Sequence, residues 1–307
     1  MKKVSVIIPV YYNEKSLTIL FTRFLKVENI LNSMGVSLEL IFVDDGSGDK
    51  SLEELLKIKF SHEQTKIVKL TRNFGAVHAS KAGLRFVTGG CFTILAADLQ
   101  DPPELIVDMV KKWLAGAKYV VCVRQSREDP FLSKLLSSIY YRLVRLCIIK
   151  DYPLGGFDIT LVDKELFPFF ENSGKNLYTP FLGYWLGYKP EVIYYHRPKR
   201  MHGRSGWSFS KKINASLDIF LGYSVFPIRF FSFIGMLVSI LSFLYGFHII
   251  INASLKGTDV PGFATIVVLI SFLLGIVIST LSIIGEYLWR ISEEINKRPE
   301  VVIEKVY

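Results

Sequence analysis

The stretch TILAADLQDPPE, residues Thr93 to Glu104, is an apolar run that stops at carboxylates and is then broken by two prolines. Its apolar part has the composition of a buried strand, and Pro-Pro is typical of the first turn of a helix. In open α/β sheets, ligands bind at the carboxyl-terminal edge of such strands. The stretch therefore predicts an α/β fold in which Asp98, Gln100 and Asp101 lie at the binding edge.

The side chains of this stretch also suggest a kind of ligand. Two carboxylates and the amide oxygen of Gln100 are hard oxygen donors, which suit Mg²⁺ or Mn²⁺ holding a diphosphate. The alternative is that the acids only complement the dipole at the start of the next helix. The residues of this stretch alone leave both interpretations open.

Further strands are expected on both sides of this one along the chain, with helical patterns between them. The buried-strand runs are Val4 to Pro9, Leu38 to Val43, Lys66 to Leu70, Cys91 to Ala96 and Tyr119 to Val123. This alternation is typical of βαβ units and a mostly parallel sheet. The glycines form neither G-x-G-x-x-G nor a P-loop, so the two common phosphate-binding fingerprints are unsupported.

Polar residues follow two of the other strands. Asp44 and Asp45 could hydrogen-bond a base N–H or ribose hydroxyls, or belong to an Asp-Gly-Ser turn that only caps a helix. Arg72 stands where a guanidinium could reach a phosphate, or it is a solvated surface charge. Later, Gly155-Gly156-Phe157-Asp158 is a tight turn that could bring Asp158 near the same edge.

Two long stretches, Phe230 to Ile251 and Phe263 to Gly285, contain no Asp, Glu, Lys or Arg. At about 1.5 Å rise per residue, each can cross a hydrocarbon core of about 30 Å. We expect two transmembrane helices, because buried core helices seldom run so long without a charge. Cations lie outside this hairpin on both sides, so the positive-inside rule places both flanks in the cytoplasm. They are Arg200, Arg204, Lys211, Lys212, Arg229, Arg290, Lys297, Arg298 and Lys305.

The net charge of +9 suits an anionic membrane surface better than nucleic acid, because no RNA- or DNA-binding motif is present. The basic loop from His196 to Trp207 is suited to holding an anionic lipid headgroup, unless it is only flanking charge. The amphipathic segment Phe131 to Lys150 could lie on the bilayer or pack against the domain or a second subunit. The three cysteines lack metal-binding spacing, as expected of buried thiols in a reducing compartment.

With these residues assembled, the chain resembles glycosyltransferase family 2, in particular the membrane-bound polyprenyl-phosphate glycosyltransferases such as bactoprenol glucosyltransferases and, more distantly, dolichyl-phosphate mannose synthase. The resemblance runs from Val4 to about Ile295. Its landmarks are VSVIIPVYYNE (4–14), FVDDGS (42–47), LTRNFG (70–75), ADLQDPPE (97–104), GGFD (155–158), RMHGRSGWS (200–208) and the apolar hairpin. Each landmark is weak alone, but their order and spacing together are specific.

The resemblance implies a Rossmann-like GT-A domain over residues 1–207, an interfacial amphipathic helix over 208–228, a transmembrane hairpin over 229–288 and a cytosolic tail over 289–307. It also implies a multi-pass protein of the bacterial inner membrane, with the catalytic domain and both termini in the cytoplasm. A homo-oligomer, with a tetramer as the suggested form, is a further implication.

The same resemblance implies a UDP-sugar donor, a polyprenyl phosphate acceptor and no nucleic-acid partner. The implied nucleotide-binding residues are Pro9, Tyr11, Glu14, Asp45 and Asp98. The implied ligands of Mg²⁺ or Mn²⁺ are Asp98 and Gln100. The implied acceptor-phosphate residues are Arg200, Arg204 and Ser205, and the implied catalytic residues are Asp98, Arg72 and Asp158, the last of these organising the acceptor or acting as base.

The expected reaction is an inverting transfer of one sugar to undecaprenyl phosphate at the cytoplasmic membrane face, supplying lipid-linked sugar for cell-envelope glycan. One alternative is a processive polysaccharide synthase, but the chain lacks a Q-x-x-R-W element. Another is a non-catalytic membrane scaffold, because Ala96 replaces the first acid of the family's D-x-D motif. With one acid fewer, we expect metal binding weaker than in relatives that carry both.

Overall fold

A computed structural model describes the chain over residues 2–124, 131–150, 152–153, 156–157, 159–173, 179–196, 216, 219–256, 262–296 and 299–307. It forms two compact units. The first comprises residues 1–218 together with Pro299–Tyr307, and the second comprises Ile219–Arg298.

The first unit is built on an eight-stranded sheet with the order β7-β5-β6-β4-β1-β2-β3-β8. Its strands are β1 Lys2–Val10, β2 Val36–Asp44, β3 Lys66–Leu70, β4 Cys91–Ile94, β5 Tyr119–Arg124, β6 Ile159–Asp163, β7 Glu191–Tyr195 and β8 Ile303–Val306. The four central strands β4, β1, β2 and β3 are parallel, whereas β6 and β8 run antiparallel to their neighbours. The predicted α/β fold with a mostly parallel core is confirmed.

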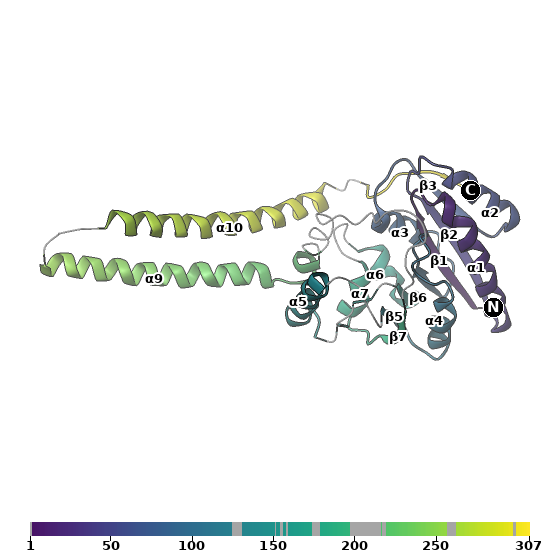
Figure 1. Ribbon diagram of the computed structural model, residues 1–307, viewed down its shortest axis with the longest axis horizontal. Coiled ribbons are helices and arrows are strands. Elements are labelled where there is room, and N and C mark those ends of the chain that lie inside the picture. Colours follow the sequence, from purple (N-terminus) through teal and green to yellow (C-terminus); the bar gives the residue numbers. More distant parts are fainter. Residues whose placement is uncertain are drawn as a thin grey trace. The chain divides into compact units, whose positions relative to one another are not determined.

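Helices cover this sheet (Figure 1). The helices of the first unit are α1 Glu14–Ser33, α2 Ser51–Ser61, α3 Ala76–Leu84, α4 Leu105–Leu114, α5 Phe131–Cys147, α6 Phe167–Glu171 after the 3₁₀ turn Lys164–Leu166, and α7 Thr179–Trp185, and those that pack on the sheet include α1, α2, α3 and α4. Alternate residues of β1, including Val6 and Ile8, share a buried cluster with Leu20 and Phe24 of α1. On the other face, a Cβ on Gly83 of α3 would lie 2.4 Å from the side chain of Ile7.

This two-sided cover explains why the central strands are largely apolar without a strict alternation of polar and apolar residues. The absence of a side chain at Gly83 lets α3 approach the sheet closely. The result is a helix–sheet–helix layering that leaves the carboxyl ends of the parallel strands as the edge from which loops emerge.

The TILAADLQDPPE stretch deviates from the expected boundaries at both ends. β4 ends at Ile94 instead of Ala96, and α4 begins at Leu105 instead of Pro103. The carbonyl oxygens of Pro102 and Pro103 accept hydrogen bonds from the amides of Leu105 and Ile106, which makes a turn before the helix. The carboxylates therefore lie on a loop longer than the sequence predicted.

The segment 289–307 was expected to be a separate tail, but it is divided between a helix and a strand, while its cytosolic location stays a prediction. Helix α10, Phe263–Ile295, continues into that range, and Ile303–Val306 returns to the sheet of the first unit as β8. The tail pairs antiparallel with β3, with Val68 opposite Val306 and Lys69 opposite Lys305.

The second unit contains two long helices, α9 Phe226–Lys256 and α10, which lie side by side (Figure 1). Both cover the predicted apolar stretches. Among the described residues, one helical segment, Phe272–Ser292, is long and apolar enough to cross a membrane, and Phe226–Val238 is a shorter apolar segment. The two-span hairpin therefore stays a prediction, as does the interfacial helix, since residues 208–215 and 217–218 lie outside the described residues.

Candidate active site at the carboxyl edge of the sheet

Asp98 lies on a loop that is fixed to the sheet and to α1. The Leu95 amide donates to the Ile7 carbonyl oxygen at 3.0 Å, which extends the β1–β4 pairing by one residue beyond the strand. The Ser16 hydroxyl of α1 donates to the Ala97 carbonyl oxygen at 2.7 Å. These contacts place Asp98, which is partly exposed, directly after the end of β4.

The loop turns sharply at the next residue. Leu99 has a φ of 62° in the left-handed region, although it is not glycine. The Gln100 amide donates to Asp98 Oδ1 at 3.1 Å across this turn. Asp98 and Gln100 are thus held close together on either side of Leu99.

Asp101 and Glu104 secure the rest of the loop. The Tyr195 hydroxyl of β7 donates to Asp101 Oδ1 at 3.5 Å, and Asp101 is buried. Arg23 of α1 donates two hydrogen bonds to Glu104, from Nε to Oε1 at 2.9 Å and from Nη2 to Oε2 at 2.5 Å. Asp101 therefore contacts β7 within the fold, four positions before the helix that it was expected to begin.

The donor set of this loop fits a hard divalent ion. Among the described residues, no group of three or more His, Cys, Asp or Glu side chains could hold a metal alone. Mg²⁺ and related ions are commonly held by one or two protein oxygens, with phosphate oxygens and water at the remaining positions. The Asp98 carboxylate and the Gln100 amide meet that requirement when a phosphorylated ligand supplies the rest.

Asp45 is buried at the end of β2 and holds the neighbouring loop. Its Oδ1 accepts from the Phe74 amide at 2.7 Å and its Oδ2 from the Gly75 amide at 2.9 Å. Burial raises the pKa of this carboxyl, against the lowering effect of the two amides. In this structure, the Asp45 carboxylate is engaged with the loop that carries Arg72.

Its neighbour Asp44 is fully buried. Oδ1 of Asp44 accepts from the Ser47 amide at 3.1 Å, while Oδ2 has no hydrogen-bond partner among the described residues. Burial raises the pKa of Asp44, opposed by the hydrogen bonds from Ser47 and by the charge of Lys69. An unpaired carboxylate oxygen inside a protein is costly, so this end of the sheet is not optimised for stability alone.

The Arg72 side chain is exposed at the same edge. Its guanidinium carbon lies 4.1 Å from the centre of the Phe74 ring, and Nη1 donates to the Asn73 carbonyl oxygen at 3.1 Å. The loop approaches Gly46 so closely that a Cβ there would lie 2.5 Å from the Arg72 carbonyl carbon. The structure thus brings the Arg72 loop together with the acidic end of β2, while the predicted phosphate contact of Arg72 stays a prediction.

The loop after β1 presents two aromatic rings. Tyr11 and Tyr12 are 47% and 56% exposed, and their ring centres lie 4.6 Å apart in an edge-to-face arrangement. The Tyr12 backbone is left-handed, with a φ of 55°, and its amide donates to the Ser47 hydroxyl at 3.3 Å. The sequence predicts a nucleotide-binding role for Tyr11, which stays a prediction, and the exposed ring of Tyr12 beside it is a further candidate that the doubled tyrosine could have indicated.

The two other predicted nucleotide residues of this region have structural partners. Pro9 lies in β1 opposite Val43. Oε2 of Glu14 accepts from the Lys50 amide at 3.1 Å, so this carboxylate joins α1 to the loop after β2. The remaining predicted site residues, Asp158, Arg200, Arg204 and Ser205, lie outside the described residues.

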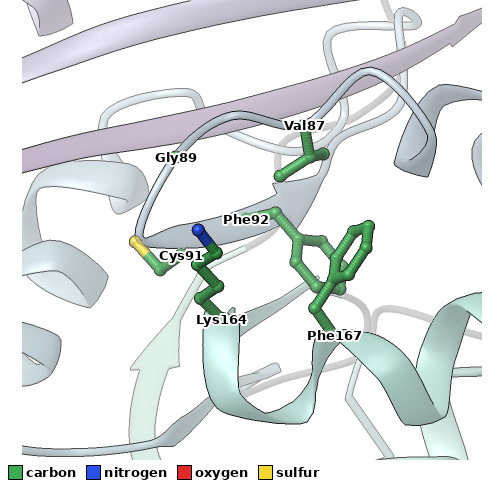
Figure 2. Close-up of a pocket in the computed structure, with 6 residues that line it drawn as sticks. All are labelled: Val87, Gly89, Cys91, Phe92, Lys164 and Phe167. Atoms are coloured by element: carbon green, nitrogen blue, oxygen red, sulfur yellow. The ribbon is translucent and has the colours of Figure 1, made fainter.

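A small cavity of about 50 Å³ lies at the opposite end of β4 (Figure 2). It is lined by Val87, Gly89, Cys91, Phe92, Lys164 and Phe167. Because Cys91 is the first residue of β4, this cavity is at the amino edge of the sheet, away from the carboxylates. It is also too small for a nucleotide sugar, since ligand sites usually measure about 300 Å³ or more.

Two named relatives match this chain over nearly its whole length. The Synechocystis sp. protein named uncharacterized glycosyltransferase sll0501 is 35% identical over 312 residues, covering 99% of this chain and 96% of that protein. The SfII prophage-derived bactoprenol glucosyl transferase of Shigella flexneri is 30% identical over 308 residues, covering 99% and 98%.

Among solved structures, the mannosyltransferase PcManGT from Pyrobaculum calidifontis is 17% identical, covers 91% of this chain and 86% of that chain, and has a TM-score of 0.48. That likeness is too low to support an argument about ligands. The profile of glycosyl transferase family 2, in contrast, matches residues 5–175, which contain every described site residue. The chain therefore belongs to glycosyl transferase family 2 and is a glycosyltransferase.

Proposed function

We propose that this enzyme transfers a single sugar from a UDP-sugar to polyprenyl phosphate at the cytoplasmic face of a bacterial membrane, with inversion at the anomeric carbon. The observation that carries the proposal is the similarity to the bactoprenol glucosyl transferase of Shigella flexneri, which extends over 99% of this chain. The similarity thus includes the apolar helices as well as the α/β unit. The candidate membrane span Phe272–Ser292 supports an acceptor that resides in a membrane.

The donor would occupy the carboxyl edge of the sheet. The exposed rings of Tyr11 and Tyr12 offer surfaces on which a base can stack, while Pro9, Glu14 and Asp45 shape the loops around it. Asp98 and Gln100 would hold Mg²⁺ or Mn²⁺ against the diphosphate. When bound, the ion would neutralise the charge that develops on the departing diphosphate.

Arg72 is the exposed cation of this edge that we assign to phosphate binding. A guanidinium binds phosphate oxygens through paired N–H groups, and its stacking on Phe74 limits the directions in which it can point. Arg72 would therefore orient a phosphate group instead of only attracting it. Orientation of this kind lowers the barrier to an in-line displacement.

The acceptor is a phosphate monoester whose second pKa is near 6, so at pH 7 it is already a strong anionic nucleophile. A general base is then dispensable for the attack on the anomeric carbon. The residues proposed to hold this phosphate are Arg200, Arg204 and Ser205, with Asp158 organising the acceptor. Two spans, formed by α9 and α10 and flanked by cytoplasmic cations, would keep the enzyme beside its lipid, in a homo-oligomer such as a tetramer.

The test is an assay of the purified full chain in nanodiscs with undecaprenyl phosphate and a panel of radiolabelled UDP-sugars. We expect one donor to give an organic-soluble product that carries one sugar per lipid and that requires a divalent ion. A sugar polymer would contradict the single transfer. Absence of lipid-linked sugar with every donor, together with no metal-dependent UDP binding by calorimetry, would support a non-catalytic scaffold instead.

A further inference from the structure

The last nine residues of the chain fold back onto the α/β unit. Strand β8 pairs with β3, and at its end the amides and carbonyls of Tyr307 and Ile67 exchange hydrogen bonds at 2.9 and 3.3 Å. Without β8, β3 would be the edge strand of the sheet, with a row of unpaired backbone groups. The tail therefore completes the sheet on the side of β3.

A buried ion pair anchors the start of this tail. Lys81 Nζ lies 2.9 Å from Glu300 Oε1, and the two side chains are only 7% and 19% exposed. Lys81 Nζ also donates to the Ser173 carbonyl oxygen at 2.8 Å. Removal of the Glu300 carboxylate would take away the negative charge that pairs with the buried Lys81 ammonium and is expected to weaken the attachment of the tail.

The tail then reaches the loop that carries Arg72. The Thr71 amide donates to the Val302 carbonyl oxygen at 3.1 Å, one residue beyond the end of β3. At the other end of the loop, Asp45 accepts from the amides of Phe74 and Gly75. The backbone on both sides of Arg72 is thus fixed, from one side by β2 and from the other by the tail.

We propose that the tail Pro299–Tyr307 is a positioning element for the transfer reaction, because it holds the Arg72 loop in place for phosphate binding. The proposal rests on the phosphate-binding role assigned to Arg72 under the proposed function. The tail follows α10 directly in the sequence, so the segment that leaves the long apolar helix is the one that fixes this loop. A displacement of about 1 Å in a positioning group can lower a rate up to about 100-fold.

The decisive variants are Glu300→Gln and, as matched control on the same tail, Glu304→Gln. Both remove one negative charge, but Glu304 pairs with Lys69 in an exposed bridge with side chains 47% and 26% exposed. In the full chain in nanodiscs, we expect Glu300→Gln to speed amide hydrogen exchange over residues 71–75 about tenfold. Exchange in β1 and β2 should stay unchanged, and Glu304→Gln should match the wild type throughout.

The kinetic arm is a double-mutant cycle with Arg72→Ala. We expect Glu300→Gln to lower kcat/KM about tenfold alone and to have little further effect when Arg72 is already removed, because both changes act on one group. Glu300→Asp, which keeps the charge, should restore part of the loss and serves in its place if Glu300→Gln does not fold. The proposal would be overturned if the losses in kcat/KM from Glu300→Gln and Arg72→Ala multiplied in the double variant, or if hydrogen exchange at residues 71–75 were unchanged in Glu300→Gln.

The hydrogen-exchange measurement does not require the enzyme to transfer a sugar. If no donor supports transfer but exchange over residues 71–75 still rises in Glu300→Gln, the proposed function fails while the coupling of tail and loop stands. If transfer is normal and exchange does not respond to Glu300→Gln, the function stands and the positioning role is wrong.

Discussion

The two ends of β2 bury carboxylates in different surroundings. Near its amino end, Glu39 accepts hydrogen bonds from the Ser5 hydroxyl at 2.5 Å, from Lys66 Nζ at 2.8 Å, and from the amide and hydroxyl of Thr88 at 2.9 and 2.8 Å. At the carboxyl end, Asp44 is at least as deeply buried but leaves one oxygen without a partner among the described residues.

The pKa values of the two groups move in opposite directions. Burial raises the pKa of both, but at Glu39 the hydrogen bonds from Lys66, Ser5 and Thr88 outweigh it and hold the pKa below its ordinary value. At Asp44, burial prevails and the pKa is raised. The carboxylate at the amino edge is therefore stabilised by its partners. The carboxyl edge, in contrast, keeps a buried carboxylate whose charged form is disfavoured, which is typical of a functional site.

The largest effect that we expect from a change at the carboxyl edge is a loss of activity. Asp98→Asn should lower kcat/KM about 100- to 1,000-fold, because it removes the one negatively charged ligand proposed for the divalent ion, while the melting temperature changes little since Asp98 is partly exposed. Asp108→Asn, on the exposed face of α4, is the matched control. Near wild-type turnover in a folded Asp98→Asn enzyme would remove Asp98 from the metal site.

The next effect is on stability. Glu39→Gln should reduce the free energy of unfolding of the α/β unit by about 2–3 kcal/mol, since it disrupts a satisfied buried network and removes the carboxylate that pairs with Lys66. Activity per folded molecule should not change. Thermal unfolding and active-site titration measure the two quantities. Lost turnover at full stability would mean that the amino edge also serves the reaction.

Glu39 and Asp44, at the two ends of β2, should contribute to the pH dependence of stability with opposite signs. The contribution of Glu39 is present above its ordinary pKa of 4.5 and is lost as pH falls through its lowered folded pKa. The difference between wild type and Glu39→Gln should therefore shrink on acidification.

For Asp44, the folded state holds the proton more tightly than the unfolded state. Its contribution is full below its ordinary pKa of 3.8 and is lost as pH rises through the raised folded pKa. Asp44→Asn should thus gain stability relative to wild type as pH rises, with a net change within about 1 kcal/mol at pH 7. Unfolding curves at several pH values check both signs, and parallel curves for the two variants would refute the contrast.

The smallest effect concerns the exposed bridge between Arg23 and Glu104. Arg23→Ala should cost at most about 1 kcal/mol and should matter less at high salt, since solvent screens a partly exposed pair. Unfolding at low and high ionic strength measures it. A loss comparable with that of Glu39→Gln would show that the carboxyl edge contributes as much to stability as the amino edge.

The sequence predicted those parts of the fold that follow from covered strands. Lys66–Leu70 was predicted with its correct bounds, and Val4 to Pro9 differs from β1 by a few residues, because most residues of both strands are apolar and buried. Strand β8, Ile303–Val306, was missed because its sequence, Ile-Glu-Lys-Val, is neither an apolar run nor an alternating one, and at a sheet edge the partner strand and not composition decides the pairing.

The candidate site was predictable in location but not in its contacts. The acids at the strand ends follow from the topology of a parallel sheet. The engagement of Asp45 with the amides of Phe74 and Gly75, however, joins segments about thirty residues apart and leaves no local pattern. The hydrogen bond from Thr71 to Val302 joins segments even further apart in the sequence and likewise leaves no local pattern.

Leu99 restricts how this region can vary. Its left-handed backbone disfavours most side chains, and β-branched residues most of all, yet its own side chain is only 3% exposed and anchors the turn in the core. Glycine would relieve the backbone but remove the anchor, whereas valine or isoleucine would keep the anchor and strain the backbone further. The residue between the two proposed metal ligands is therefore under two opposed structural constraints, and the range of acceptable amino acids at that position is narrow although its side chain lies in the core.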